Sequence, residues 1–374
     1  MSGVKQPAIC PAEEAFDLEE YLARSAERIV KQLVKSAAFH PKASLFMAKY
    51  ALASKKAAQR RKEAAARGEH IPPFLIASIT SACNLHCVGC YARSLETCGD
   101  ECRSDQLSGE DWGRVFSQAR DLGISFILLA GGEPMLRRDV LEQAAQYPEI
   151  LFPVITNGTL LSGEYLDFFE TNRNLIPVLS IEGNQGTTDA RRGEGMFRLL
   201  CAAMGQLSER GLTFGTSITV TAENLTEVTS DSFLGSLTQA GCKAVIYVEF
   251  VPTEPALQPL ALDEAGRLAL EHRVAELRKR EDTPMLVSFP GDEKGSKGCL
   301  AAGRGFFHIN ARGGAEPCPF SPYSDVNVKD HSLREVLDSA LVRALREEGL
   351  LEGEHDGGCV LYQKQAQVEA LLQH

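Results

Sequence analysis

The sequence of 374 residues predicts an α/β fold: a partial (β/α)6 TIM-like barrel with an N-terminal helical extension and a small C-terminal cysteine-containing module. Two observations lead to this prediction. Short apolar runs rich in β-branched residues alternate with helix-length segments between residues 74 and 251, which is typical of a parallel sheet buried on both faces. Several of the helical segments end in a glycine, as at Gly123, Gly211 and Gly241. Six such units are two short of a complete barrel.

The chain divides into three predicted segments. Residues 1–70 show helical spacing and no strand pattern, with helices expected over Asp17–Ala37 and Ser44–Arg67 and with Ser44 as the N-cap of the second. Residues 71–284 form the barrel, and 285–374 form the C-terminal module. The predicted strands are 74–80, 125–131, 151–156, 175–181, 213–220 and 244–251, and the helices lie near 108–121, 137–146, 162–171, 195–210, 225–239 and 263–280.

Beyond residue 284 the alternation is expected to stop. Residues 285–330 are rich in glycine, proline and cysteine, which indicates a small irregular module with a hairpin around Gly313–Gly314. Two helices are expected after it, near Leu333–Glu347 and Gln363–Gln373.

Composition and charge restrict the classes of function. The net charge of −11 argues against nucleic-acid binding over the whole chain, and no stretch has the apolar length of a bilayer span. The N-terminus lacks the apolar core of a secretory leader, so eleven cysteines predict a reducing, cytoplasmic location. The basic, Ala-rich stretch within 49–67 has two interpretations, a solvated helix packed on the barrel or a peripheral contact with an acidic partner or membrane surface.

Three cysteines, Cys83, Cys87 and Cys90, directly follow the first predicted strand with the spacing C-x3-C-x2-C. Reactive loops of such sheets lie at the carboxyl ends of the strands. Three thiolates there can hold a [4Fe–4S] cluster by three irons and leave the fourth iron open, as a catalytic site requires. The alternative is a Cys3His zinc site with His86, in a zinc- or Fe–S-stabilised binding protein without catalytic activity on a degenerate barrel.

The stretch CNLHCVGCY, with Tyr91 after the last cysteine, resembles the cluster loop of the radical S-adenosylmethionine (radical SAM) superfamily. The resemblance covers about residues 74–250 and implies the same partial barrel. It also implies that S-adenosylmethionine (SAM) binds the open iron and is cleaved by one electron to a 5′-deoxyadenosyl radical, which takes hydrogen from a substrate. A flavodoxin or ferredoxin is then expected as the electron donor.

Further motifs of this family follow in order along the chain. The second strand ends in Gly131, Gly132, Glu133 and Pro134, which resemble the GGEP motif that receives the methionyl ammonium. The resemblance implies further cofactor contacts from Asn157 in ITNGT, from Ser180 and Glu182 in LSIEG, from Arg191 or Arg192, and from Ser217. Relatives often carry Asp where Glu182 stands. We expect that only one of the two adjacent arginines points inward, to pair with the methionyl carboxylate; the alternative for each is a surface salt bridge.

The remaining cysteines suggest a second metal site. Cys299, Gly313 and Cys318 fit C-x13-G-x4-C, which resembles the start of the SPASM and Twitch extensions that carry auxiliary iron–sulfur clusters. With Cys359 they would hold one auxiliary [4Fe–4S] cluster, and His355, Asp356, another cysteine or the substrate would complete it. The alternative is that these three are unrelated buried cysteines.

Other residues near the expected sites have no assigned role. Cys98 and Cys102 are candidates for extra ligands, a redox pair or neither, and Asp292, Glu293 and Glu249 are candidates to line the cavity. The substrate class stays open among small molecules, lipids and proteins or peptides. The lack of a strand pattern in residues 1–70 argues against a ribosomal peptide, because enzymes of that group often carry a small N-terminal sheet.

Overall fold

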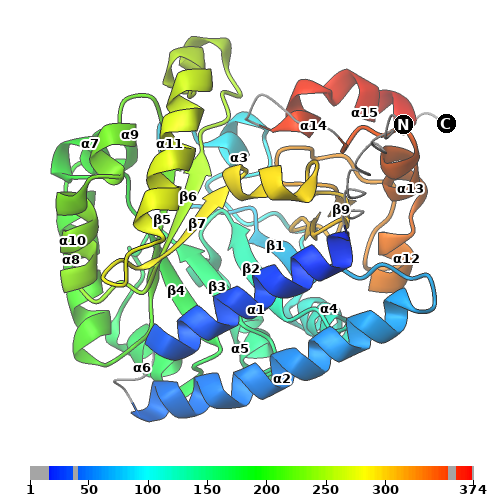
Figure 1. Ribbon diagram of the computed structural model, residues 1–374, viewed down its shortest axis with the longest axis horizontal. Coiled ribbons are helices and arrows are strands. Elements are labelled where there is room, and N and C mark those ends of the chain that lie inside the picture. Colours follow the sequence, from blue (N-terminus) through cyan, green and yellow to red (C-terminus); the bar gives the residue numbers. More distant parts are fainter. Residues whose placement is uncertain (1–16, 37–40, 353–358, 373–374) are drawn as a thin grey trace, which may run out of the picture.

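A nine-stranded, mostly parallel sheet forms the centre of the computed structural model, which describes residues 17–36, 41–352 and 359–372 (Figure 1). The strand order is β7-β6-β5-β4-β3-β2-β1-β8-β9, and only β9 is antiparallel to its neighbour. The strands are β1 (Phe74–Thr80), β2 (Phe126–Gly131), β3 (Phe152–Thr156), β4 (Leu175–Ser180), β5 (Gly215–Val220), β6 (Ala244–Glu249), β7 (Met285–Phe289), β8 (Phe306–Ile309) and β9 (Ala315–Glu316).

The six predicted β/α units are confirmed as β1 to β6 with the helices between them. Ser108 caps α4 through a capping box, and Gly123 ends it in the left-handed conformation. The connecting helices are α3 (Tyr91–Ser94), α4 (Gly109–Leu122), η1 (Pro134–Leu136), α5 (Arg138–Ala145), α6 (Gly163–Thr171), α7 (Gln185–Arg192), α8 (Met196–Glu209), α9 (Leu225–Val228), α10 (Asp231–Gln239), η2 (Pro255–Leu260) and α11 (Glu264–Leu277).

Three helix predictions need correction. The expected helix over 225–239 is two helices, because Ser230 is extended and caps α10. The expected helix over 333–347 is also broken, into α12 (Leu333–Leu337) and α13 (Ala340–Glu347), with Ser339 as the cap of the second. The last predicted helix, near Gln363–Gln373, is α15 (Gln365–Leu371), and a short helix that was not predicted, α14 (Val360–Gln363), precedes it.

The N-terminal helices α1 (Leu18–Ser36) and α2 (Pro41–Ala65) lie across the ends of the strands opposite to the cysteine loop (Figure 1). Tyr50 of α2 is buried and donates to the carbonyl of Ser125, just before β2. The basic stretch of α2 contacts the barrel, since the guanidinium of Arg61 is buried and donates to the carbonyl of Gly123. Because α2 begins at Pro41, Ser44 is not its N-cap.

The alternation of strands does not stop at residue 284. β7 continues the sheet beside β6, and β8 pairs in parallel with β1, with Phe74 opposite Phe306. β8 and β9 form the predicted hairpin, in which Gly313 takes a φ of +92°. The division of the chain into three separate units stays a prediction, but one sheet includes strands from both sides of the expected boundary. No helix within the described ranges is long and apolar enough to cross a bilayer.

Candidate active site

The loop with Cys83, Cys87 and Cys90 leaves the carboxyl end of β1, and all three thiols are free and partly exposed. Arg93 holds the loop from inside, because its guanidinium donates to the carbonyls of Cys83 and Leu85, both at 3.0 Å. Two of the three thiols have contacts with neighbouring side chains: the thiol of Cys98 hydrogen bonds to Cys83 and lowers the pKa of Cys83, and the guanidinium of Arg192 lies beside the sulfur of Cys87. Such a set of soft donors fits an iron–sulfur cluster.

The two glycines after β2 are required by backbone packing against the cysteine loop. A Cβ atom on Gly132 would lie 1.9 Å from the carbonyl oxygen of Ala82, next to Cys83. Gly131 has a φ of +116°, and a Cβ there would lie 2.4 Å from the carbonyl oxygen of Thr80. The pair therefore lets the end of β2 approach the start of the loop closely.

The carboxylate of Glu133 ties the ends of β2 and β3 together. It is buried and accepts hydrogen bonds from the amide of Met135 at 3.0 Å, the hydroxyl of Thr156 at 2.8 Å and the amide of Asn157 at 2.7 Å. Burial is the main reason that its pKa is raised to about 7, and these hydrogen bonds oppose the shift. Its predicted contact with the methionyl ammonium stays a prediction.

This burial predicts a pH dependence of stability for the cluster-free protein. Because the folded-state pKa of Glu133 lies above the ordinary glutamate value of 4.5, its stabilising contribution is complete below pH 4.5 and is lost as the pH rises through about 7. Between pH 4.5 and 8 the loss amounts to about 3 kcal/mol, at about 1.4 kcal/mol per pKa unit. Denaturant unfolding of wild type and Glu133→Gln at several pH values measures it.

The control for this prediction is Glu164→Gln, on an exposed carboxylate of α6. We expect the free energy of unfolding of Glu133→Gln to fall less with pH than that of wild type, and that of Glu164→Gln to follow wild type. Equal pH slopes for all three proteins would refute the assignment to Glu133.

Asn157, at the end of β3, connects the sheet to the cysteine loop. Its side-chain amide donates to the side-chain oxygen of Asn84 at 2.9 Å, and its own oxygen accepts from Thr159. Asn84 lies between Cys83 and Cys87 in the sequence. Asn157 thus positions the loop, and its predicted cofactor contact stays a prediction.

Glu182 and both neighbouring arginines form a buried charged cluster. The guanidinium of Arg192 donates to Oε1 of Glu182 through Nε at 2.9 Å and Nη2 at 2.5 Å, and Nε of Arg191 lies 3.7 Å from the same oxygen. The other carboxylate oxygen accepts from the amide of Thr219 on β5. The expectation that only one arginine points inward is wrong, because both side chains reach the same carboxylate from the last turn of α7.

The arginine cluster borders the cysteine loop. Nη1 of Arg192 lies 3.9 Å from the sulfur of Cys87, and the carbonyl of Arg191 accepts from the amide of Val88. Nε of Arg191 is buried and makes no hydrogen bond to any residue in the described ranges. This donor, near the thiols, suits the carboxylate of an added cofactor.

The other predicted cofactor residues lie near the same edge of the sheet. Ser180 ends β4 and is opposite Ser217 of β5 in the parallel register, and Pro134 begins η1 directly after Glu133. Tyr91 begins α3 and packs against Phe320, with ring centroids 4.5 Å apart. The cofactor contacts of these residues stay predictions.

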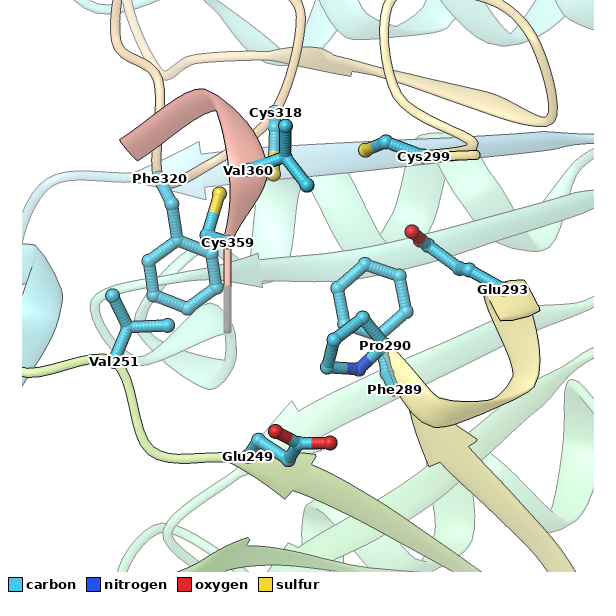
Figure 2. Close-up of a pocket in the computed structure, with 10 residues that line it drawn as sticks. All are labelled: Glu249, Val251, Phe289, Pro290, Glu293, Cys299, Cys318, Phe320, Cys359 and Val360. Carbon is cyan, nitrogen blue, oxygen red and sulfur yellow. The ribbon is translucent and has the colours of Figure 1, made fainter. Parts of the chain in front are cut away.

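The three C-terminal cysteines line one pocket, as Figure 2 shows. Cys299 follows η3 (Gly291–Ser296), Cys318 follows β9, and Cys359 precedes α14. Cys299 and Cys318 are buried, and the thiols of Cys318 and Cys359 hydrogen bond to each other. The structure therefore gathers thiols from three distant segments, although His355 and Asp356 lie outside the described residues.

Tyr91 and Phe320 connect the two groups of cysteines. Tyr91 follows Cys90 in the sequence, and Phe320 lines the pocket of Cys318. Burial raises the pKa of the Tyr91 hydroxyl, and the nearby thiols of Cys90 and Cys318 add to this shift. Within the folded chain, one aromatic contact therefore separates the two candidate cluster sites.

Two predicted candidates are placed differently from what the sequence suggests. His86 is exposed and its Nε2 lies 2.9 Å from Asp100, and no three His, Cys, Asp or Glu side chains in the described ranges are grouped to hold a single metal ion. Asp292 pairs with Arg278 at 2.7 Å and does not line the pocket, whereas Glu293 and Glu249 do. Cys102 is exposed, with its sulfur 3.7 Å from the hydroxyl of Thr80.

Comparison with known proteins gives the family. The sequence model of the Radical SAM superfamily matches residues 77–230. The chain is 28% identical over 310 residues to an AdoMet-dependent heme synthase of Methanosarcina barkeri, covering 75% of this chain and 87% of that protein. It is 26% identical over 280 residues to a PqqA peptide cyclase of Rhizobium meliloti, covering 71% of this chain and 74% of that protein.

The fold has a counterpart among solved structures. SuiB of Streptococcus suis, in a crystal structure with bound S-adenosylmethionine, superposes with a TM-score of 0.62 at 17% identity, over 77% of this chain and 71% of SuiB. Residues 77–230 are a domain of the Radical SAM superfamily, and the chain is a radical SAM enzyme with a C-terminal extension. Its cofactors are accordingly SAM and iron–sulfur clusters.

Proposed function

We propose that Cys83, Cys87 and Cys90 hold the catalytic [4Fe–4S] cluster and that Cys299, Cys318 and Cys359 hold one auxiliary [4Fe–4S] cluster. When bound, the catalytic cluster and SAM supply a 5′-deoxyadenosyl radical that takes hydrogen from the substrate. The observation that carries the proposal is that three free thiols lie on one loop after β1 and three others line one pocket, with the contact between Tyr91 and Phe320 between the two places.

The chain's own residues would position SAM beside the first set of thiols. The end of β2, with Gly131, Gly132 and Glu133, lies against the start of the cysteine loop and would face the methionyl amine. Across the site, the buried Nε of Arg191, which lies 3.7 Å from the Glu182 carboxylate but makes no hydrogen bond within the described ranges, would donate to the methionyl carboxylate. Arg192 would keep its pair with Glu182 and orient α7.

The substrate would reach the carboxyl end of the sheet, where the catalytic site opens. The relatives act on different molecules, since one is named a heme synthase and another a peptide cyclase. A small molecule, a lipid, or a peptide or protein therefore fits this proposal. We further propose a cytoplasmic enzyme that takes electrons from a flavodoxin or ferredoxin, while peripheral membrane contact through 49–67 stays a prediction.

Replacement of Cys299, Cys318 and Cys359 together by alanine tests the auxiliary site. Anaerobically reconstituted wild type is expected to hold about eight irons per chain, and the variant about four. The variant is expected to keep cleaving SAM with dithionite, because its catalytic cluster is intact. Iron analysis and chromatography of 5′-deoxyadenosine measure the two results. An unchanged iron content in the variant would show that these thiols hold no cluster.

A further inference from the structure

Glu293 is a buried carboxylate in the pocket of the auxiliary cysteines. Its residue exposure is 2%, and it projects from η3 into the space between Cys299 and the sheet (Figure 2). Its Oε1 makes no hydrogen bond to any residue within the described ranges. The carboxylate accepts from the amide of Leu300 and interacts with the thiol of Cys299. Glu293 is therefore in direct contact with one expected cluster ligand.

No basic side chain in the described ranges forms an ion pair with Glu293. Arg304 lies nearby, but its guanidinium donates to the carbonyls of Cys299 at 2.7 Å and Ser296 at 3.1 Å. A buried carboxylate without a cation is costly, and buried charges in proteins are paired or bind metals. An iron atom in the pocket would supply the missing positive partner.

We propose that Glu293 is the fourth protein ligand of the auxiliary cluster, which completes a Cys3Glu donor set with Cys299, Cys318 and Cys359. The inference rests on the proposed function, because it needs a cluster at those cysteines. Figure 2 shows the Glu293 carboxylate near Cys299, while the other carboxylate of the pocket, Glu249, lies at the end of β6 on the far side. Oε1 of Glu293 is the free donor atom of the set.

This donor set has a consequence for the substrate. With four protein ligands, the auxiliary cluster keeps no open iron, so the substrate does not bind to it. Replacement of a thiolate by a harder ligand also changes the electronic properties of an iron–sulfur cluster, as the higher potentials of Rieske centres illustrate. The auxiliary cluster would then exchange electrons without binding the reacting molecule.

The test uses the full chain with Cys83, Cys87 and Cys90 replaced by alanine, so that only the auxiliary cluster contributes. This background protein is expected to hold about four irons per chain. Glu293→Ala and Glu293→Gln are expected to lose one iron on mild oxidation, to about three, and to show the electron paramagnetic resonance signal of a [3Fe–4S] cluster. Glu293→Cys restores a four-ligand set and is expected to keep about four irons.

Glu249→Gln is the matched control, because it removes the other carboxylate of the same pocket and is expected to keep about four irons. Mössbauer spectra provide a second measurement. In the background protein with Glu293 unaltered, one iron is expected to differ from the three thiolate-bound irons, and Glu293→Cys is expected to remove that difference.

Three outcomes overturn the proposal, and they are distinguishable. Unchanged iron content and spectra in Glu293→Ala and Glu293→Gln would show that Glu293 is not a ligand while the auxiliary cluster exists. Equal iron loss in Glu249→Gln would show a general effect of the pocket carboxylates. A background protein without iron would overturn the auxiliary cluster itself, and with it this inference.

Discussion

Replacement of Cys83, Cys87 and Cys90 together by alanine is expected to abolish reductive cleavage of SAM and to lower the iron content from about eight to about four per chain. The three thiols lie on one loop at the carboxyl end of β1, and none of them is in a disulfide. Without them, no iron is held where SAM must bind. Formation of 5′-deoxyadenosine under anaerobic dithionite reduction measures the loss.

Cys201→Ala is the control, since Cys201 is an exposed cysteine on α8, away from both groups of thiols. It is expected to keep the wild-type iron content and cleavage activity. Cleavage that persists in the triple variant would mean that SAM is activated elsewhere, and the catalytic assignment would be wrong. A loss of all iron would instead contradict the auxiliary cluster, because Cys299, Cys318 and Cys359 are intact in this variant.

Gly132→Ala is expected to destabilise the protein by about 3 kcal/mol or more and to reduce cluster loading. The added methyl group would lie 1.9 Å from the carbonyl oxygen of Ala82, and 3.0 Å from the amide nitrogen of Cys83. These neighbours are backbone atoms, so no side-chain rotation relieves the clash. The end of β2 and the cysteine loop must therefore move apart. Denaturant unfolding of the cluster-free protein and iron analysis after reconstitution measure both effects.

Gly205→Ala provides the matched substitution. Gly205 lies inside α8, and a Cβ there meets no atom within 4 Å. Alanine is expected to stabilise this helix by about 0.5–1 kcal/mol, because glycine loses more conformational freedom in a helix. If Gly132→Ala were as stable as Gly205→Ala, the close packing of β2 against the cysteine loop would not hold in solution.

The sequence predicted the central strands and the position of the cysteine loop after β1 because both depend on local patterns. Six apolar runs gave β1 to β6, and the spacing of Cys83, Cys87 and Cys90 indicated their chemistry. The places of β7 and β8 in the sheet could not be predicted from local patterns. The sequence of a strand does not determine which other strand it pairs with, and here β7 pairs with β6 and β8 pairs with β1.

In the candidate site, too, local patterns predicted some features, while others depend on how the chain packs. Glu133 and Asn157 were found from motifs, but their mutual hydrogen bond required the packing of β2 beside β3. Arg191 and Arg192 both reach Glu182, because their long side chains converge on it from the end of α7. The order of residues in the sequence does not reveal this convergence. The sequence identified Glu293 only as a candidate to line the cavity. The structure adds that Glu293 is buried beside the cysteines and that its Oε1 makes no hydrogen bond within the described ranges.

The parallel pairing of β8 with β1 restricts how this enzyme could have diverged. β1 leads into the catalytic loop, and its outer edge is covered from Phe306 to Ile309 by the segment that carries Cys299 and Cys318 on either side. A gene shortened before this segment would encode a barrel with a bare strand edge, prone to self-association. The C-terminal extension is thus a structural part of the barrel, and exchanging it between relatives requires a compatible β1 as well.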